Sequence, residues 1–162
     1  MMMRAVLFFL AIAVCGAAAQ PAAEPLEAQL AAAVQADQVT VIHLWAPWCD
    51  NCLHELAHGG WRDFLAANPG VKFVFVTIWN DRDGREVLAR NGVSGQPNLS
   101  VYLHPNPSRD KGVMVSSLLG QPVTWIPTTW VYKKGKLRYA LNYGELRFPI
   151  LQQLISDTSQ SW

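Results

Sequence analysis

An apolar run that ends at two cysteines constrains this chain more than any other feature. Residues 39–46 are Val-Thr-Val-Ile-His-Leu-Trp-Ala, and Pro47 follows them. A short, β-branched apolar run bounded by proline is typical of a buried strand. Cys49 and Cys52 come next, and the residues after Cys49 favour a helix. The sequence therefore predicts that the cysteine pair lies where a buried strand ends and a helix begins.

That position suits thiol chemistry. The first turn of a helix has unpaired backbone N–H groups and the positive end of the helix dipole, and both favour a thiolate. We therefore expect Cys49 to be the nucleophile. Cys52 lies within reach to resolve a mixed disulfide, so the two would form a redox-active disulfide. A zinc-binding pair or an inert pair is the alternative.

The first nineteen residues have the pattern of a secretory signal peptide. Arg4 supplies the positive region, residues 5–14 supply the apolar run, and Ala17-Ala18-Ala19 supplies small residues for cleavage. Because the apolar run is short for a membrane span, we expect cleavage rather than an uncleaved anchor. Lipidation of Cys15 is a third possibility, which the bulky Val14 before it disfavours.

Residues 20–162 are expected to form one domain. The chain has 162 residues and is 51% hydrophobic, which suffices for one full core. Removing Arg4 from the 13 basic residues leaves 12, equal to the 12 acidic ones, and no block of like charge points to a nucleic acid. Once the signal is removed, Cys49 and Cys52 are the only cysteines. A pair so close in sequence would stabilise almost nothing as a structural disulfide, which favours a redox or metal role.

The expected elements alternate between strands and helices, as in an α/β protein. Helices are expected at 26–35, 49–59, 61–67, 81–91, 113–119 and 145–156, and strands at 39–46, 71–79, 99–103, 123–132 and 137–143. Gly59-Gly60 should break the helix that carries the cysteines, and Gly92 is a plausible C-cap. Residues 133–136 should form a hairpin turn. Residues 20–24 are rich in proline and alanine, and we expect a flexible lead-in there.

The segment Trp45-Ala46-Pro47-Trp48-Cys49-Asp50-Asn51-Cys52 resembles the active-site signature of the thioredoxin superfamily. The longer pattern resembles its exported TlpA/ResA-type branch of bacterial thiol–disulfide oxidoreductases. The resemblance implies a thioredoxin fold, with a central mixed β-sheet flanked by helices and an insertion before a cis-proline strand. It also implies a periplasmic enzyme that needs no organic cofactor and no metal. Its partners would be disulfide-containing protein clients and a membrane-embedded thiol reductase that donates electrons, with cytochrome c maturation as one setting.

The resemblance also assigns substrate contacts. Pro47 and Trp48 flank the cysteines, and Pro127 corresponds to the family's cis-proline because it precedes the expected hairpin and last helix. The residue before that proline, here Ile126, would offer backbone hydrogen bonds to an incoming peptide. An ordinary trans proline at the start of a strand is the alternative.

Two residues are candidates for the acid that exchanges a proton with the buried cysteine. In thioredoxin this acid lies in the strand before the motif, where this chain has His43. A histidine could act as a base near neutral pH, or it could be a hydrogen-bonded core residue. In the TlpA/ResA branch a glutamate three residues after the second cysteine has a related role, and Glu55 has that spacing. The proline usual two residues later is replaced by Ala57, so a solvated helix glutamate remains an alternative.

The dipeptide between the cysteines bears on the direction of electron flow. Asp50 puts a negative charge beside the expected thiolate, which should raise the pKa of Cys49. A less stabilised thiolate favours the disulfide, so we predict a reductant or isomerase-like role rather than a strong disulfide donor.

The sequence His54-Glu55-Leu56-Ala57-His58 matches the His-Glu-x-x-His pattern of zinc proteases. The extended form of that motif fails, because Trp61 stands where a glycine is needed. Two other classes of function stay open. One is metal handling by the two thiols, for copper above all, and the other is a binding module that uses the fold without turnover.

Overall fold

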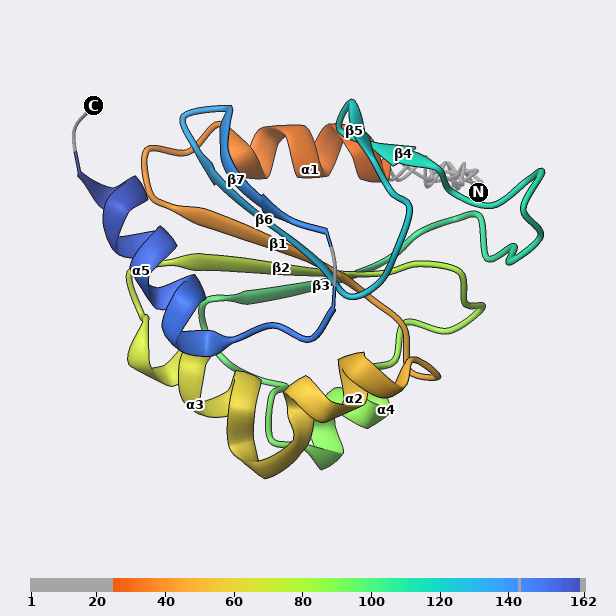
Figure 1. Ribbon diagram of the computed structural model, residues 1–162, viewed down its shortest axis with the longest axis horizontal. Helices are drawn as coiled ribbons and strands as arrows, with labels where there is room; N and C mark the ends of the chain where they lie inside the picture. The colour runs from red at the N-terminus through yellow and green to blue at the C-terminus, as the bar shows by residue number, and fades with distance from the viewer. Residues whose placement is uncertain (1–24, 143, 161–162) are drawn as a thin grey trace, which may run out of the picture.

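A five-stranded mixed sheet forms the centre of the protein (Figure 1). The computed structural model describes residues 25–142 and 144–160. The strands follow the order β3-β2-β1-β6-β7 and comprise Leu99–Leu103 (β3), Lys72–Thr77 (β2), Thr40–Trp45 (β1), Thr128–Lys133 (β6) and Lys136–Leu141 (β7). β1, β2 and β3 are parallel, β6 runs antiparallel to β1, and β7 runs antiparallel to β6. The expected signal peptide, Cys15, the 20–24 lead-in and Tyr143 lie outside the described residues.

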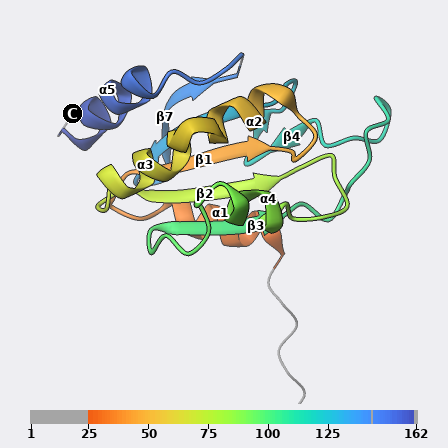
Figure 2. The same cartoon turned by 90° about the horizontal axis from the view of Figure 1, so that it is seen from below.

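Helices cover both faces of this sheet. They are Leu26–Val34 (α1), Asp50–Leu56 (α2), Gly60–Ala67 (α3), Arg85–Arg90 (α4) and Phe148–Ser159 (α5), with a 3₁₀ turn at Ala57–Gly59 (η1). α1 lies on one face, and α2, α3 and α4 lie on the other (Figures 1 and 2). α5 packs beside α3, since the ring of Phe148 contacts those of Trp61 and Phe64. Within the described part of the chain, no helix has the length and apolar character that a membrane crossing requires.

The apolar runs predicted as strands form the middle of the sheet because they are covered on both faces. All six residues of β1 are buried, and so are five of the six in β2. Trp61 of α3 packs on the sheet against the rings of Phe73 and Phe75. Continuous apolar strands of this kind are typical of parallel strands buried on both faces.

The segment between β2 and β6 supplies the expected insertion. It contributes α4, the edge strand β3 and a two-stranded hairpin made of Ser117–Leu118 (β4) and Gln121–Pro122 (β5). The prediction of a helix at 113–119 was therefore wrong. Leu119 and Gly120 have φ values of 50° and 70°, so they form a two-residue turn between Leu118 and Gln121. Such a turn suits a tight hairpin and ends any helix.

The expected break at Gly59-Gly60 is present and gives a testable prediction. Gly60 begins α3, and a Cβ there would collide with the backbone oxygen of Glu55 and lie 2.8 Å from the ring of Phe148. We expect Gly60→Ala to lower the free energy of unfolding by about 2 kcal/mol, because neither neighbour can move freely. Urea denaturation measures the change. Gly112→Ala is the matched control, since nothing lies within 4 Å of its Cβ position, and equal values for the two variants would contradict the prediction.

Candidate active site

Cys49 occupies the N-cap of α2, directly after β1. Its Sγ accepts a hydrogen bond from the backbone N–H of Cys52 at 3.4 Å. The strand therefore fixes where the sulfur lies, and the helix supplies the donor that stabilises it. This is the arrangement predicted from the sequence, and it places Cys49 where a thiolate is favoured.

The pKa of Cys49 is lowered to about 7. The largest cause is a hydrogen bond from the Cys52 side chain, and the backbone N–H groups of Cys52 and Asn51 add to it. Burial opposes the shift, and so does Asp50 through its negative charge. Asp50 thus acts in the expected direction, but the hydrogen bonds outweigh it.

Cys52 lies behind Cys49 and is 1% exposed, against 8% for Cys49. Burial raises the pKa of the Cys52 thiol far above its ordinary value, and the hydrogen bond to Cys49 adds to the rise. The two thiols are therefore electrostatically distinct. The Cys49 thiol ionises near neutral pH, whereas the Cys52 thiol keeps its proton unless a nearby base removes it.

The peptide bond between Ile126 and Pro127 is cis, and it lies opposite the cysteines. The Cys49 thiol donates to the Ile126 carbonyl oxygen at 3.7 Å, which places the outer sulfur beside the backbone that precedes β6. A pocket of about 390 Å³ opens next to the sulfur. Its lining comprises Trp48, Cys49, Asp50, Asn51, Trp79, Trp125 and Ile126.

Sequence reasoning missed two residues of this pocket. Trp125 is 52% exposed and lies on the chain just before Ile126, while Trp79 follows β2. No sequence signal marked either residue, because the exposure of Trp125 and its place beside the site are features of the fold. Pro47, a predicted substrate contact, instead lines a separate hollow with residues 80–87 and Leu103.

The insertion holds Trp48 in place. The Trp48 indole donates to the Trp79 carbonyl oxygen at 3.1 Å, and the Trp79 indole donates to that of Val115 at 3.0 Å. The guanidinium of Arg109 lies 3.9 Å from the centre of a Trp48 ring, which is a cation–π contact. Through Arg109 and Val115, the insertion therefore forms part of the rim of the site.

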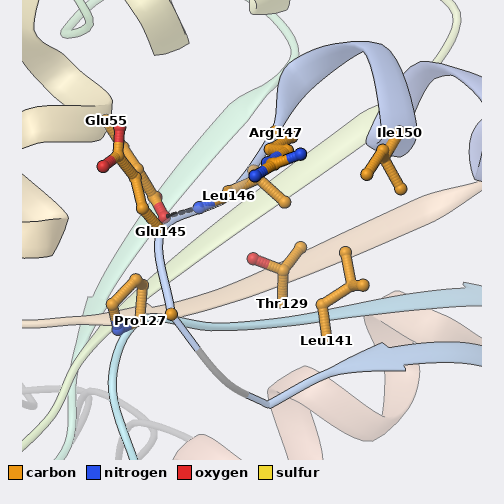
Figure 3. Close-up of a pocket in the computed structure, with 9 residues that line it drawn as sticks. Glu55, Pro127, Thr129, Leu141, Glu145, Leu146, Arg147 and Ile150 are labelled. Atoms are coloured by element: carbon orange, nitrogen blue, oxygen red, sulfur yellow. Dashed lines mark hydrogen bonds between the residues drawn. The ribbon is translucent and has the colours of Figure 1, made fainter.

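Glu55 is buried beneath the cysteines, with 1% of its surface exposed. Its Oε1 accepts from the backbone N–H of Leu146 at 2.7 Å (Figure 3). Its Oε2 accepts from the indole of Trp61 at 3.0 Å. Burial raises the pKa of Glu55 to about 7, although both hydrogen bonds oppose the rise. The alternative of a solvated helix glutamate was wrong, because residues of the loop before α5 cover the carboxyl group.

His43 lies next to Glu55, so the two candidate proton carriers form one cluster. The Nε2 of His43 is 3.3 Å from Oε2 of Glu55, and its Nδ1 is 2.9 Å from the hydroxyl of Thr129. Burial lowers the pKa of His43 to about 3, so the ring is neutral at physiological pH. His43 is both a hydrogen-bonded core residue and a neighbour of the acid.

The His-Glu-x-x-His pattern does not form a protease site. A zinc protease holds both histidines on one continuous helix, but α2 ends at Leu56 and His58 has φ 52°. His54 is exposed beside Glu145, whereas Glu55 is buried among Trp61, His43 and Leu146. Among the residues that the structure describes, no three His, Cys, Asp or Glu side chains are grouped to hold a metal ion.

Comparison with solved structures finds the same architecture in several bacterial proteins. A secreted disulfide oxidoreductase of Mycobacterium tuberculosis, homologous to DsbE of E. coli, is 19% identical over 76% of this chain and 84% of its own, with a TM-score of 0.55. A DsbF homologue of Corynebacterium diphtheriae is 18% identical over 76% of this chain and 73% of its own, with a TM-score of 0.56. A thioredoxin-family thiol:disulfide interchange protein of Chlorobium tepidum is 14% identical over 80% of this chain and 85% of its own, with a TM-score of 0.56. The chain has a thioredoxin fold.

Within this thioredoxin fold, the cysteines and the cis proline lie together as the sequence predicted. No model of a protein family matches the chain, and no curated protein matches it. Identities below 20% support the fold and leave the chemistry to be argued from the residues themselves.

Proposed function

We propose that this chain is an exported thiol–disulfide oxidoreductase that reduces disulfide bonds in client proteins. The observation that carries the proposal is the asymmetry of the cysteine pair. Cys49 is at the N-cap of α2 beside an open pocket and its pKa is about 7, while Cys52 is buried and keeps its proton. A nucleophile beside an open pocket and a resolving thiol behind it are what thiol–disulfide exchange requires.

The first step uses the outer sulfur. The thiolate of Cys49 attacks one sulfur of a client disulfide, so a Cys49–client bond forms and the client S–S bond breaks. The departing client sulfur takes a proton from solvent. Trp48, Trp125 and Ile126 receive the client segment around its cysteine, with an apolar side chain in the pocket beside Cys49.

The second step uses the inner thiol. Cys52 gives up its proton, and its sulfur attacks Sγ of Cys49. The Cys49–Cys52 disulfide forms, and the second client sulfur leaves and is protonated. Two electrons have then passed from the pair to the client, and a membrane-embedded thiol reductase would restore the dithiol, as the family resemblance implies.

Glu55 takes the proton of Cys52 in this scheme. Its charge raises the pKa of Cys52, so the carboxylate is close enough to act on the thiol through space, and one bridging water would complete the path. Because the pKa of Glu55 is about 7, it can both take and release a proton near neutral pH. His43 stays neutral and contacts Glu55, so it acts on Cys52 only through that carboxyl group.

The moderate pKa of Cys49 supports the reducing direction of electron flow. Thioredoxin, a reductant, has a pKa of about 7 at the equivalent thiol, whereas a strong oxidant such as DsbA has about 3.5. The value of about 7 for Cys49 favours the reducing direction. The secretory pattern of residues 1–19 supports a periplasmic setting for the reaction, in which an apocytochrome c is one candidate client.

The reduction potential of the Cys49–Cys52 pair tests this direction. Equilibration with dithiothreitol or glutathione should give a value near about −270 mV, that of thioredoxin, because the thiolate is only moderately stabilised. A value near about −120 mV, that of DsbA, would make the protein a disulfide donor and contradict the proposal. Reduction of a model disulfide protein by the dithiol form, with the oxidised form as control, tests the activity itself.

A further inference from the structure

Three buried side chains form a line that starts at Glu55 and leads away from the cysteines. Oε2 of Glu55 is 3.3 Å from Nε2 of His43, and Nδ1 of His43 is 2.9 Å from Oγ1 of Thr129. His43 in β1 and Thr129 in β6 are direct partners in the sheet register, so their side chains leave the same face side by side. All three residues are at most 2% exposed.

The other partners of Glu55 can only donate. The backbone N–H of Leu146 and the indole N–H of Trp61 keep the same role whether the carboxyl group is charged or neutral. A neutral imidazole differs, because one nitrogen donates and the other accepts, and the hydroxyl of Thr129 can do either. His43 and Thr129 are therefore the members of the cluster that can respond when Glu55 changes charge.

We propose that His43 changes tautomer each time Glu55 takes up or releases its proton, and that the Thr129 hydroxyl permits this by reversing its hydrogen bond. With Glu55 protonated, the carboxyl O–H donates to Nε2, and Nδ1–H donates to Thr129. With Glu55 ionised, Nε2–H donates to the carboxylate, and Nδ1 accepts from the Thr129 hydroxyl. Both charge states of Glu55 then have a complete set of partners, although the three side chains are almost fully buried.

Between the two states the cluster loses one proton, which is the one that Cys52 supplied. A pocket of about 200 Å³ gives that proton a route to solvent, because Glu55 and Thr129 both line it together with the loop before α5 (Figure 3). Pro127 also lines this pocket, whereas Cys49 and the tryptophans line the other one. The proton can thus leave while a client covers Cys49.

Other titratable groups lie near the cluster of Glu55, His43 and Thr129. Cys49 and Cys52 lie on the α2 side, and Glu145 and Arg147 lie on the rim of the pocket. The His43 ring also packs against the uncharged rings of Trp61 and Phe75, with ring centres 4.7 and 4.8 Å away. Burial disfavours an imidazolium here, which leaves the choice of tautomer as the ring's response. His43 and Thr129 are positioning residues, since each acts on the thiol only through Glu55.

Nitrogen-15 NMR of the reduced protein with labelled histidine tests the inference without any client. Between pH 5 and 9, the unprotonated nitrogen of His43 should change from Nε2 to Nδ1, with a midpoint that follows the ionisation of Glu55. A ring that keeps one tautomer throughout, or that carries protons on both nitrogens at the acidic end, would overturn it. The tautomer change has a role only if the protein reduces disulfides, so the inference rests on the proposed function. The two tests are distinguishable, because the titration can fail while the reduction assay succeeds.

Substitutions at Thr129 give a second measurement. Thr129→Val keeps the shape and removes the hydroxyl, so a proton on Nδ1 would have no acceptor. The Nε2–H tautomer would then prevail and stabilise the carboxylate, and we expect the midpoint to fall by about one pH unit, a tenfold change in proton affinity. Thr129→Ser should restore the midpoint.

Thr40→Val is the matched control, because Thr40 is a buried β1 threonine whose hydroxyl bonds elsewhere, to the Ala33 carbonyl. It should leave the midpoint unchanged. An unshifted midpoint in Thr129→Val, or equal shifts in Thr129→Val and Thr40→Val, would overturn the role of Thr129. The tautomer titration of the native protein decides the proposal if Thr129→Val does not fold.

Discussion

Cys49→Ser should abolish disulfide reduction, with a loss on the order of 10³-fold or more. The hydroxyl that replaces the thiol does not ionise near neutral pH, so the outer position has no nucleophile. The hydrogen bond from the Cys52 side chain, together with backbone N–H groups at the start of α2, lowers the pKa of the Cys49 thiol to about 7, but no comparable shift could bring a serine hydroxyl into that range. Reduction of a model disulfide protein, followed with Cys15→Ser in every sample, measures the loss.

Cys52→Ser separates the roles of the two cysteines. Cys49 can still attack, but nothing resolves the product, so a mixed disulfide with the client should accumulate and appear as a mass increase. Because Cys52 is 1% exposed and Cys49 faces the pocket, the adduct should form on Cys49 alone. An adduct on Cys52 in the Cys49→Ser variant would contradict this assignment.

Glu55→Gln should slow the reaction by about 100-fold, the usual effect of removing a general base. The amide keeps the size of the side chain and can still accept from Leu146. It cannot take a proton, so Cys52 loses its acceptor while Cys49 keeps its helix N-terminus. The defect should therefore lie in resolution, with a normal rate of mixed-disulfide formation in rapid-quench measurements.

The exposed Glu86 of α4 offers a matched control. Glu86 lines neither the pocket beside Cys49 nor the one beside Glu55, so Glu86→Gln removes the same charge outside the site and should leave both steps unchanged. Equal rates for Glu55→Gln and Glu86→Gln would show that Glu55 takes no part in the reaction.

The same Glu55→Gln variant should alter how stability depends on pH. The pKa of Glu55 is raised in the folded state to about 7, from an ordinary value of 4.5. Its contribution to stability is therefore fully present below pH 4.5 and is lost as pH rises through 7. Removing Glu55 removes this loss, so the variant should gain up to about 3 kcal/mol relative to the native protein between pH 4.5 and 7.

Urea denaturation of both proteins across that range measures the difference. His43 has the opposite effect, because burial lowers its pKa and its contribution grows as pH rises. That contribution is present in both proteins and cancels in the comparison. If the free energy of unfolding depended on pH in the same way in the variant and the native protein, the raised pKa of Glu55 would be contradicted.

Local sequence determined much of this protein. The apolar run before the cysteines became β1, and the helix-favouring residues after Cys49 became α2, so the N-cap position of the sulfur followed from neighbouring residues alone. Lys134 and Gly135 form the predicted hairpin turn, with φ values of 51° and 73°. Gly92 lies just past the end of α4, as a C-cap glycine should. These features are set by backbone preferences within a few residues, which a single sequence displays.

The segment 113–119 shows where local preference misleads. Its composition is compatible with a helix, but Leu119 and Gly120 turn the chain and pair Leu118 with Gln121. The Leu119 backbone N–H also donates to the side chain of Glu27 in α1, a contact 92 residues away. Pairing and long-range contacts of this kind decide a short segment, and neither is visible in its own residues.

Only the tertiary structure decided the surroundings of the acid. Glu55 had the right spacing from Cys52, but spacing could not say whether it was exposed, and three chain segments bury it: α3 through Trp61, β1 through His43 and the loop before α5 through Leu146. Thr129 and Trp125 carried no local signal at all, because their importance comes from facing His43 and Cys49 across the sheet register and the pocket. Local residues set the position of a thiol on its helix, whereas the burial that raises the pKa of a carboxyl group requires atoms from distant parts of the chain.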